Sequence, residues 1–201
     1  MLLANVCPIG FMQVPDLEKR KAIIRTARDL FSRRPYHEVR LEDVATAAKV
    51  GKGTLYVYFT SKDHLYIELV VDAFDALLID CEALADDDDA PAWQSLEELI
   101  RHVARWTLKH PTIFDIIRSG VHPAGNDALR TRRRKLRHII ERVIRRGVER
   151  GEMDDPSPEL TANFIPAMAR SGAVFGRTSL KADELARKIL AVLAGGIRRQ
   201  A

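Results

Sequence analysis

Apolar residues recur with the period of an α-helix along almost the whole chain. From residue 17 they fall every three or four positions, until Pro35 ends the pattern, because the residue before a proline avoids the helical region. No stretch alternates apolar and polar residues between turn signals as a strand would. The sequence therefore predicts an all-α protein of about nine helices. These cover residues 17–34, 41–48, 52–59, 61–84, 93–110, 114–117, 128–150, 158–175 and 182–197.

Three local signals refine these helices. Residues 60–63, Thr-Ser-Lys-Asp, have the pattern of a capping box and predict the start of the long fourth helix. Ser157 and Pro158 suit the N-cap and first position of a later helix. Pro166 lies inside that helix and is expected to kink it.

Composition excludes several classes of protein. The 201 residues, 46% of them hydrophobic, are enough to bury a core without disulfides or metals. No apolar run reaches the ~18 residues of a membrane span, and two cysteines, Cys7 and Cys81, cannot form a disulfide framework. Residues 1–15 are apolar but lack the basic region and cleavage site of a secretion signal, so we interpret them as a flexible arm. A cytoplasmic location with no membrane partner is expected.

Charge is distributed unevenly, although the net charge is only +4. Residues 16–64 hold eleven Lys/Arg and seven Asp/Glu, and residues 65–100 hold eleven Asp/Glu and no Lys or Arg. Residues 128–150 hold ten basic and two acidic side chains. A polyanion would prefer the N-terminal block and be repelled by the segment that follows it.

Residues 41–59 carry the most informative pattern, two short helices joined by a tight turn. This is the spacing of a helix-turn-helix. The second helix, Lys-Gly-Thr-Leu-Tyr-Val-Tyr, buries few of its side chains, and its basic start, glycine and two tyrosines suit a DNA groove. An ordinary helical corner with buried tyrosines is the alternative. A phosphate loop at Gly51-Lys52 is disfavoured, because residue 53 is glycine where that motif requires Ser or Thr.

Each outward residue type has a role that fits DNA. Lys52, Tyr56 and Tyr58 can bind phosphates, and Gly53 allows the backbone of this helix to approach the DNA backbone closely. Thr54 and Val57 can touch base edges or a thymine methyl group. Lys62, at the start of the next helix, can add a further phosphate contact.

The stretch from Leu41 to Leu65 resembles the DNA-binding domain of the TetR family of transcriptional regulators. The shared residues include Val44-Ala45, Lys52-Gly53-Thr54-Leu55-Tyr56, Tyr58-Phe59 and Ser61-Lys62, and the similarity covers about 50 residues. The resemblance implies a helix-turn-helix DNA-binding domain over residues 16–64 and a helical effector-binding and dimerisation domain over 65–201. It also implies a homodimer that binds a palindromic double-stranded DNA operator, most simply a repressor released by a small-molecule effector.

Family roles carry over by position. Thr54, Tyr56, Val57 and Tyr58 match the recognition helix, and Lys62 matches a phosphate-binding lysine. Arg40 stands at the start of the second helix, where the family usually has a threonine that caps the helix and contacts phosphate. Lys49 and Lys52 complete the predicted DNA contacts. Lys49 stands where the family usually has the turn glycine, and Gly51 where it usually has a capping serine. Either Lys49 adopts a left-handed conformation, at a cost of about 1 kcal/mol, or Gly51 moves the bend by one residue.

An effector pocket is expected among the helices of residues 93–180. Its expected lining is mainly aromatic or aliphatic, with two histidines as polar anchors: Trp93, His102, Val103, Trp106, His110, Phe114, Ile117, Ile139, Val143, Phe164, Met168 and Phe175. Basic side chains outnumber acidic ones there, so a small apolar ligand that is neutral or anionic is favoured over a cation. His102 and His110 are ~12 Å apart along a helix, too far to share a metal. A filled core without a cavity is the alternative.

Small and apolar residues at helical spacing near the C-terminus suggest a dimer interface of two helices from each protomer. The expected residues are Ala162, Ala169, Ala173, Gly176, Leu185, Ile189, Val192 and Gly196. Packing within one chain is the alternative. The arginine-rich run 130–137 is interpreted as a solvated face, with contact to an anionic effector or to the acidic segment as alternatives.

Two other classes of function compete with a regulator. A helical enzyme is disfavoured, because no nucleophile–histidine set, metalloprotease motif or paired-carboxylate signature is present, and no cofactor or metal is expected. A helical interaction module that has lost DNA binding is favoured only by the departures at Lys49 and Gly51.

Overall fold

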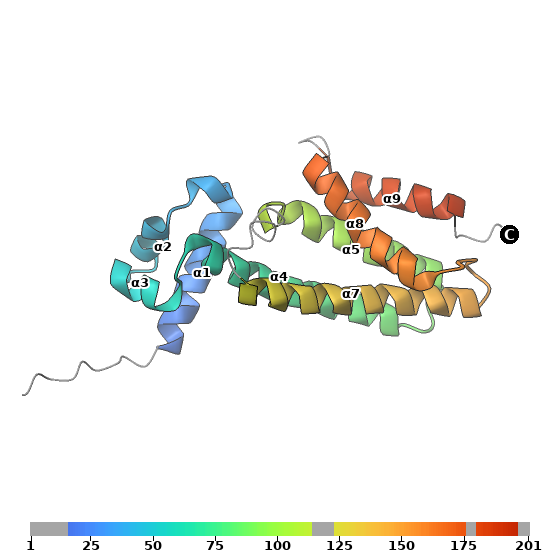
Figure 1. Cartoon of the computed structure of the whole chain (residues 1–201), viewed down its shortest axis with the longest axis horizontal. Coiled ribbons are helices and arrows are strands. Elements are labelled where there is room, and N and C mark those ends of the chain that lie inside the picture. The colour runs from blue at the N-terminus through green and yellow to red at the C-terminus, as the bar shows by residue number, and fades with distance from the viewer. Residues whose placement is uncertain (1–15, 114–122, 176–179, 197–201) are drawn as a thin grey trace, which may run out of the picture. The chain divides into compact units, whose positions relative to one another are not determined.

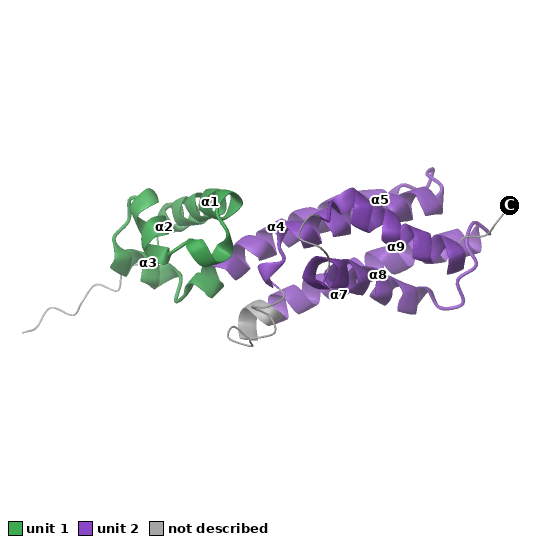
Figure 2. Ribbon diagram, turned by 90° about the horizontal axis from the view of Figure 1, so that it is seen from above, with its two compact units in different colours: residues 1–65 green, residues 66–201 purple. Residues whose placement is uncertain are grey.

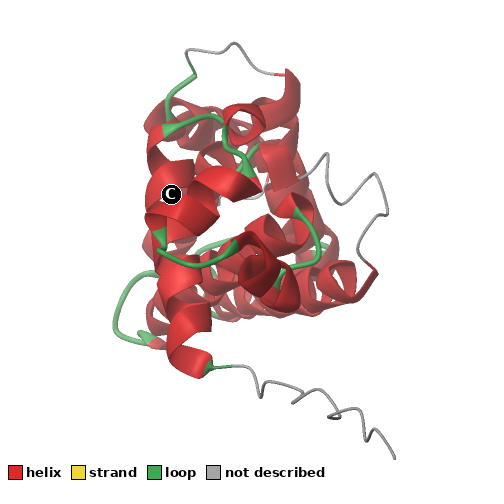
Figure 3. Ribbon diagram, turned by 90° about the vertical axis from the view of Figure 1, so that its left-hand side faces the viewer, coloured by secondary structure: helices red, strands yellow, loops and turns green. Residues whose placement is uncertain are grey.

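The computed structural model describes residues 16–113, 123–175 and 180–196. In these ranges the chain forms eight α-helices and one short 3₁₀ helix and no strand (Figure 3). The expected all-α class is confirmed. The ninth expected helix, through Phe114 and Ile117, falls outside the described residues.

Two compact units divide the chain, residues 1–65 and 66–201 (Figure 2). The division lies one residue from the expected domain boundary. In the described part of the chain, no helix is both long and apolar enough to cross a membrane.

The first unit contains α1 (Leu17–Arg33), η1 (Tyr36–Glu38), α2 (Leu41–Ala47) and α3 (Lys52–Tyr58). Helix α1 begins at Leu17 because the Asp16 carboxylate accepts hydrogen bonds from the Glu18 and Lys19 backbone N–H groups. Helices α1 and α2 pack together, and α2 packs on α3. Among its described residues, seven fully buried side chains form the core of this unit: Ile23, Ala27, Val39, Val44, Leu55, Phe59 and Leu65.

Helix α4 (Lys62–Asp86) begins one residue later than the capping pattern predicts. The side chain of Ser61, not Thr60, accepts the capping hydrogen bond, from the His64 backbone N–H at 3.0 Å. The Nδ1 atom of His64 in turn lies 3.3 Å from the Thr60 backbone N–H. His64 thus binds the N–H of the residue before the N-cap and not that of the N-cap itself, so the two bonds differ from the usual capping box.

Around α5 (Ala92–Lys109) the second unit assembles α7 (Pro123–Glu149), α8 (Pro158–Phe175) and α9 (Ala182–Gly196), as Figure 1 shows. Helix α5 packs against all three. Its buried residues include Leu96, Leu99, Ile100, Val103 and Ala104. Helix α7 begins at Pro123, five residues before the expected start at residue 128, since proline is well suited to the first position of a helix.

Arginines of α7 join it to the acidic part of α4 and to the loop that follows. Arg132 forms a bidentate pair with Asp75, at 2.8 and 2.6 Å, and Arg142 donates to Glu82 at 2.6 Å. Arg146 binds the Ala85 carbonyl oxygen at 2.8 Å. Part of the basic segment therefore faces the acidic segment 65–100, one of the alternatives left open by the sequence.

Candidate functional site

The turn between α2 and α3 is built on Lys49. Its φ of 56° is the only positive value at a described non-glycine residue, whereas Gly51 is extended with φ −66°. The Val50 N–H donates to the Ala45 carbonyl at 3.0 Å and closes the turn. Lys49 therefore takes the left-handed conformation at the usual glycine position, and Gly51 does not move the bend.

Helix α3 turns one face to the core and the other to solvent. Leu55 and the following Phe59 are fully buried. Tyr56 is 41% exposed and Val57 64% exposed, and Thr54 is half-buried. The outward face is therefore short, partly apolar and reachable by a large partner.

Gly53 lies on this outward side with open space beside it. A Cβ atom built on Gly53 has no atom of the chain within 4 Å. The fold itself therefore has room for a larger residue at this position. A partner that approaches the α3 backbone closely would explain a glycine here better than packing does.

Lys52 is held in the free protein by a carboxylate of α2. Its Nζ atom lies 2.8 Å from Glu42 Oε1, and this hydrogen bond raises the pKa of Lys52 and lowers that of Glu42. The ammonium group also lies 6.0 Å from the centre of the Tyr56 ring. Both partners are exposed, so a phosphate could replace Glu42 at small cost.

Arg40 and Lys49 are exposed at the two ends of α2. The Arg40 backbone N–H donates to Asp43 Oδ2 at 3.2 Å. This bond, followed by that from Arg34 at 3.0 Å, lowers the pKa of Asp43. Asp43 thus accepts a hydrogen bond from the backbone of the N-cap residue of α2, and the Arg40 side chain is exposed.

Lys62 is partly engaged by the first unit itself. Its Nζ atom donates to the Tyr36 carbonyl at 3.0 Å and lies 4.2 Å from the centre of the Tyr36 ring. The Tyr36 hydroxyl donates to the carboxylate of Asp63. An ammonium group has three protons, so Lys62 can hold this turn in place and still bind a phosphate.

Tyr58 is half-buried and its hydroxyl binds the main chain of Asp16. It differs in this from Tyr56, whose ring is exposed. The predicted phosphate contact of Tyr58 stays untested, but its single proton already points to the Asp16 carbonyl, 3.1 Å away.

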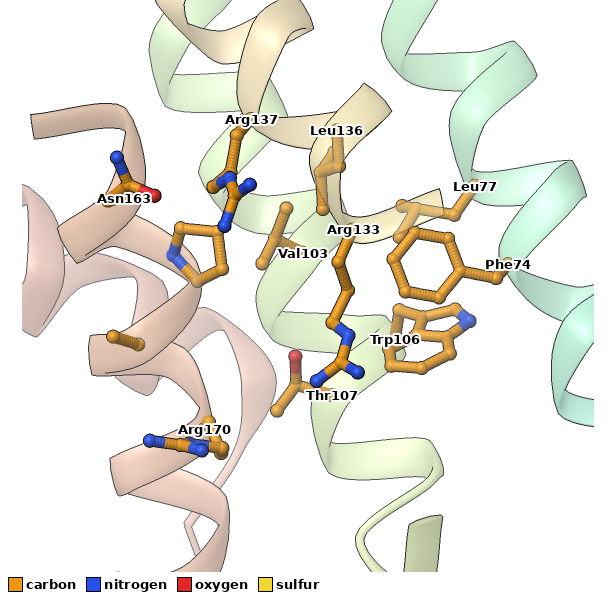
Figure 4. Close-up of a pocket in the computed structure, with 12 residues that line it drawn as sticks. Phe74, Leu77, Val103, Trp106, Thr107, Arg133, Leu136, Arg137, Asn163 and Arg170 are labelled. Carbon is orange, nitrogen blue, oxygen red and sulfur yellow. The ribbon is translucent and has the colours of Figure 1, made fainter. Parts of the chain in front are cut away.

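The second unit contains a cavity of ≈ 230 Å³ between α4, α5, α7 and α8 (Figure 4). Two of the predicted lining residues, Val103 and Trp106, lie in its wall. Sequence reasoning missed the other ten: Phe74, Leu77, Thr107, Arg133, Leu136, Arg137, Asn163, Pro166, Ala167 and Arg170. Two of these ten, Arg133 and Arg137, belong to the arginine-rich run 130–137. For that run, contact with an anionic effector was one of the alternatives left open by the sequence.

The remaining predicted lining residues lie elsewhere. Trp93, Ile139 and Val143 are buried in the core, and the Trp93 ring nitrogen donates to Glu97 at 2.8 Å. His102 and Met168 are half-buried outside the cavity wall, and Nδ1 of His102 lies 2.9 Å from the Glu98 carbonyl oxygen. Phe114 and Ile117 are outside the described residues.

His110 stands beside the cavity without lining it. Its ring lies 5.1 Å from that of Trp106. Burial, assisted by Lys109, lowers its pKa to about 4, so its ring is neutral near pH 7 and does not serve as a cationic anchor. Among the described residues, no group of three His, Cys, Asp or Glu is placed to hold a metal ion.

The predicted interface residues divide into two groups. Ala162, Ala169, Leu185 and Ile189 are between 0 and 4% exposed and pack inside their own chain, where a partner cannot reach them. Ala173 is half-buried, Val192 and Gly196 are exposed, and Gly176 lies outside the described residues.

A different apolar face of α8 is exposed instead. Four of its large side chains are between 46 and 84% exposed, at positions that share one side of the helix: Leu160, Phe164, Val174 and Phe175. On α9, Val192 is 66% exposed. Phe164 and Phe175, expected in the pocket, therefore belong to an outer surface.

Comparison with known proteins matches both units. The family description "Bacterial regulatory proteins, tetR family" matches residues 23–69, and "Tetracyclin repressor-like, C-terminal domain" matches residues 89–174. The transcriptional repressor NicS of Pseudomonas putida is 27% identical over 141 residues, which cover 68% of this chain and 66% of NicS.

Two solved structures extend the likeness to the whole fold. A TetR/AcrR-family regulator of Thermobifida fusca is 26% identical, with a TM-score of 0.74 over 90% of this chain and 100% of that one. A protein of Saccharomonospora viridis, solved in complex with choline, is 19% identical, with a TM-score of 0.72 over 92% of this chain and 100% of that one.

Proposed function

The chain belongs to the TetR family of bacterial transcriptional regulators that bind DNA, and from this we propose that it is a repressor that leaves its operator when a small molecule enters its second unit. The main support for DNA binding by this chain is the outward face of α3. Its glycine, tyrosine and valine are exposed beside a lysine, and no packing within the described residues accounts for them. A module without DNA binding would have no use for this combination.

We assign the residues of this face by their chemistry. Thr54 and Val57 read base edges, Gly53 permits close approach, and Tyr56 and Lys52 bind phosphates. Arg40, Lys49 and Lys62 add phosphate contacts around the helix, since their charges are exposed or keep unused protons. Tyr58 positions α3 through its bonds to Asp16.

The operator is a palindrome and the protein a homodimer in this proposal. Helix-turn-helix dimers present two recognition helices to half-sites about one DNA turn, ~34–36 Å, apart. The exposed side chains of α8, with Val192 of α9, form an apolar patch that suits a second copy of the chain. The buried residues Ala162, Ala169, Leu185 and Ile189 support this patch from inside.

The effector site in this proposal is the cavity beside Trp106. One of its four helices, α8, also carries the dimer patch, so a ligand there can favour one dimer arrangement over another. A similar structure with choline bound shows that the fold can hold a small molecule. The proposed setting is the bacterial cytoplasm, where the operator lies and the Cys81 thiol stays reduced.

The direct test measures binding to the DNA upstream of the protein's own gene by fluorescence anisotropy over a range of salt concentrations. The wild type is expected to bind a palindrome as a dimer. Lys52→Gln is expected to reduce the slope of log K against log salt by about 0.9 for each protomer's lost phosphate contact. Lys181→Gln, an exposed lysine at the start of α9, is the control and should leave the slope unchanged. Equal slopes for wild type and Lys52→Gln would contradict the assigned pose.

A further inference from the structure

The cavity beside Trp106 has an apolar wall made by three helices. Phe74 of α4 meets Trp106 of α5 edge to face, with ring centres 4.6 Å apart. Val103 and Leu136 add aliphatic surface from α5 and α7. A flat apolar group can therefore lie against this wall and replace water there.

Three arginines also line the same cavity, and no acidic side chain does so among the residues that the structure describes. Arg133 and Arg137 extend from α7 and Arg170 from α8 (Figure 4), and of the three only Arg133 is half-buried, whereas Arg137 and Arg170 are exposed. Of the twelve lining residues that the structure describes, the charged ones are these three. Within the described parts of the chain, no carboxylate lies within 4 Å of their guanidinium groups.

Two adjacent arginines of α7 show how unusual this arrangement is. Arg132 has a bidentate partner in Asp75. Arg133 donates only to the Leu129 carbonyl of its own helix, at 3.3 Å, so most of its five N–H donors are unused by the described residues. Burial and then the charges of Arg170, Arg130 and Arg137 lower the pKa of Arg133. The cavity thus holds like charges near one another, and a bound anion would reduce their repulsion.

From this geometry we infer that the cavity selects a small ligand with an anionic carboxylate or phosphate head and a flat apolar body. The head would lie among Arg133, Arg137 and Arg170, which match such groups through paired N–H donors. The body would lie on Phe74 and Trp106. This inference rests on the proposed effector site and adds the chemical class of its ligand.

Size limits the ligand further. The cavity of ≈ 230 Å³ is smaller than the ~300–1,000 Å³ typical of sites for drug-sized ligands. A single ring with one acidic head is therefore a suitable probe. The side chains of Thr107 and Asn163 also line the cavity and can hydrogen-bond a polar substituent.

The test uses four compounds that share a benzene ring and differ in the charge of the head: phenyl phosphate, benzoate, benzamide and benzylammonium. Calorimetric titration of the full-length protein is expected to give affinities in that order. The affinity for phenyl phosphate should exceed that for benzamide by at least about tenfold, since a hydrogen bond between charged groups contributes about that factor to affinity. The difference should shrink as salt is added.

Two variants and a control locate the selectivity. Arg133→Met and Arg170→Met should each lower the affinity for phenyl phosphate about tenfold and leave the affinity for benzamide unchanged. Arg134→Met, one position along α7, is the control, because Arg134 is exposed and does not line the cavity. Thermal unfolding of the ligand-free variants checks their fold, and Arg133→Met is expected to melt no lower than wild type because it removes repulsion among the arginines.

The outcomes separate this inference from the proposed function. Benzylammonium or benzamide binding as tightly as phenyl phosphate, or an equal loss in Arg134→Met, would overturn the inference even if those compounds released DNA. Phenyl phosphate binding that follows the expected order but leaves DNA affinity unchanged would support the ligand class and contradict the proposed switch.

Discussion

The hydroxyl of Tyr58 and the main chain of Asp16 are joined by two hydrogen bonds across 42 positions of sequence. The Asp16 N–H donates to the hydroxyl at 2.8 Å, and the hydroxyl donates to the Asp16 carbonyl at 3.1 Å. These bonds fasten the last turn of α3 to the start of α1. The orientation of α3 is therefore set by a tyrosine that the sequence assigns to DNA.

Tyr58→Phe is expected to lower the free energy of unfolding by about 1 kcal/mol, because it leaves the Asp16 groups without their partner. Tyr56→Phe is its matched control in the same helix. The Tyr56 variant should keep the stability of wild type within about 0.5 kcal/mol and lose DNA affinity. Urea unfolding and fluorescence anisotropy measure the two effects. Equal behaviour of the two variants would contradict the division of roles.

Gly53→Ala should stabilise the protein while weakening DNA binding. The new methyl group meets no atom of the chain within 4 Å, and alanine is favoured over glycine in a helix by about 0.8–1 kcal/mol. The same methyl group would stand between α3 and the DNA backbone. A variant that is more stable and binds DNA as well as wild type would show that no partner approaches this position closely.

Lys49→Gly is expected to stabilise the turn, since φ 56° is strained for a residue with a side chain by about 1–2 kcal/mol. The greater freedom of glycine in the unfolded chain offsets about 0.4–1 kcal/mol of this gain. Lys49→Ile, whose branched side chain resists this conformation, should destabilise. Chemical denaturation of both variants tests the sign of the change in the free energy of unfolding. A Lys49→Gly variant less stable than wild type would show that the turn is not strained.

Phe164→Glu is expected to convert a dimer into a monomer, because it places a charge in the exposed apolar patch of α8. Ile79→Glu is the matched control. Ile79 is 71% exposed on α4, away from the patch, compared with 51% for Phe164, and its replacement should leave the dimer intact. Sedimentation equilibrium at micromolar concentration measures both. A dimeric Phe164→Glu would exclude this face as the interface.

Stability should fall in acid through His110. Its pKa is lowered to about 4 in the fold from about 6.5 in the unfolded chain. Between those values the unfolded chain binds a proton that the folded protein does not, so the free energy of unfolding falls as pH drops from about 6.5 to 4. The loss is at most about 1.4 kcal/mol per pH unit. His110→Gln should show a shallower dependence in the same interval, and an unchanged slope would contradict the assignment.

Local patterns predicted the helices well because a helix boundary depends on a few neighbouring residues. The turn at Lys49 and the first position of α8 at Pro158 are determined in this way. The capping residue of α4 was displaced by one position, since Thr60 and Ser61 are chemically similar and only the three-dimensional path distinguishes them.

Sites made by several helices were harder to predict. A run of arginines does not say that Arg132 turns to Asp75 while Arg133 turns to the cavity, because that depends on how α7 is rotated against α4 and α8. The same holds for α8. Small residues such as Ala162 and Ala169 suit contact within a chain as well as between chains, and burial assigns them to the first.

Pro166 lies in the wall of the cavity and inside α8. Proline has no N–H, so α8 lacks the hydrogen bond that would bind the Ala162 carbonyl, and the helix bends most easily at this turn. The exposed Phe164 is in the same turn. In the proposed dimer, a ligand that pushes on Pro166 would bend α8 like a hinge and tilt Phe164 against the partner. Two-fold symmetry repeats that tilt in the other protomer, so the relative rotation of the two subunits is doubled.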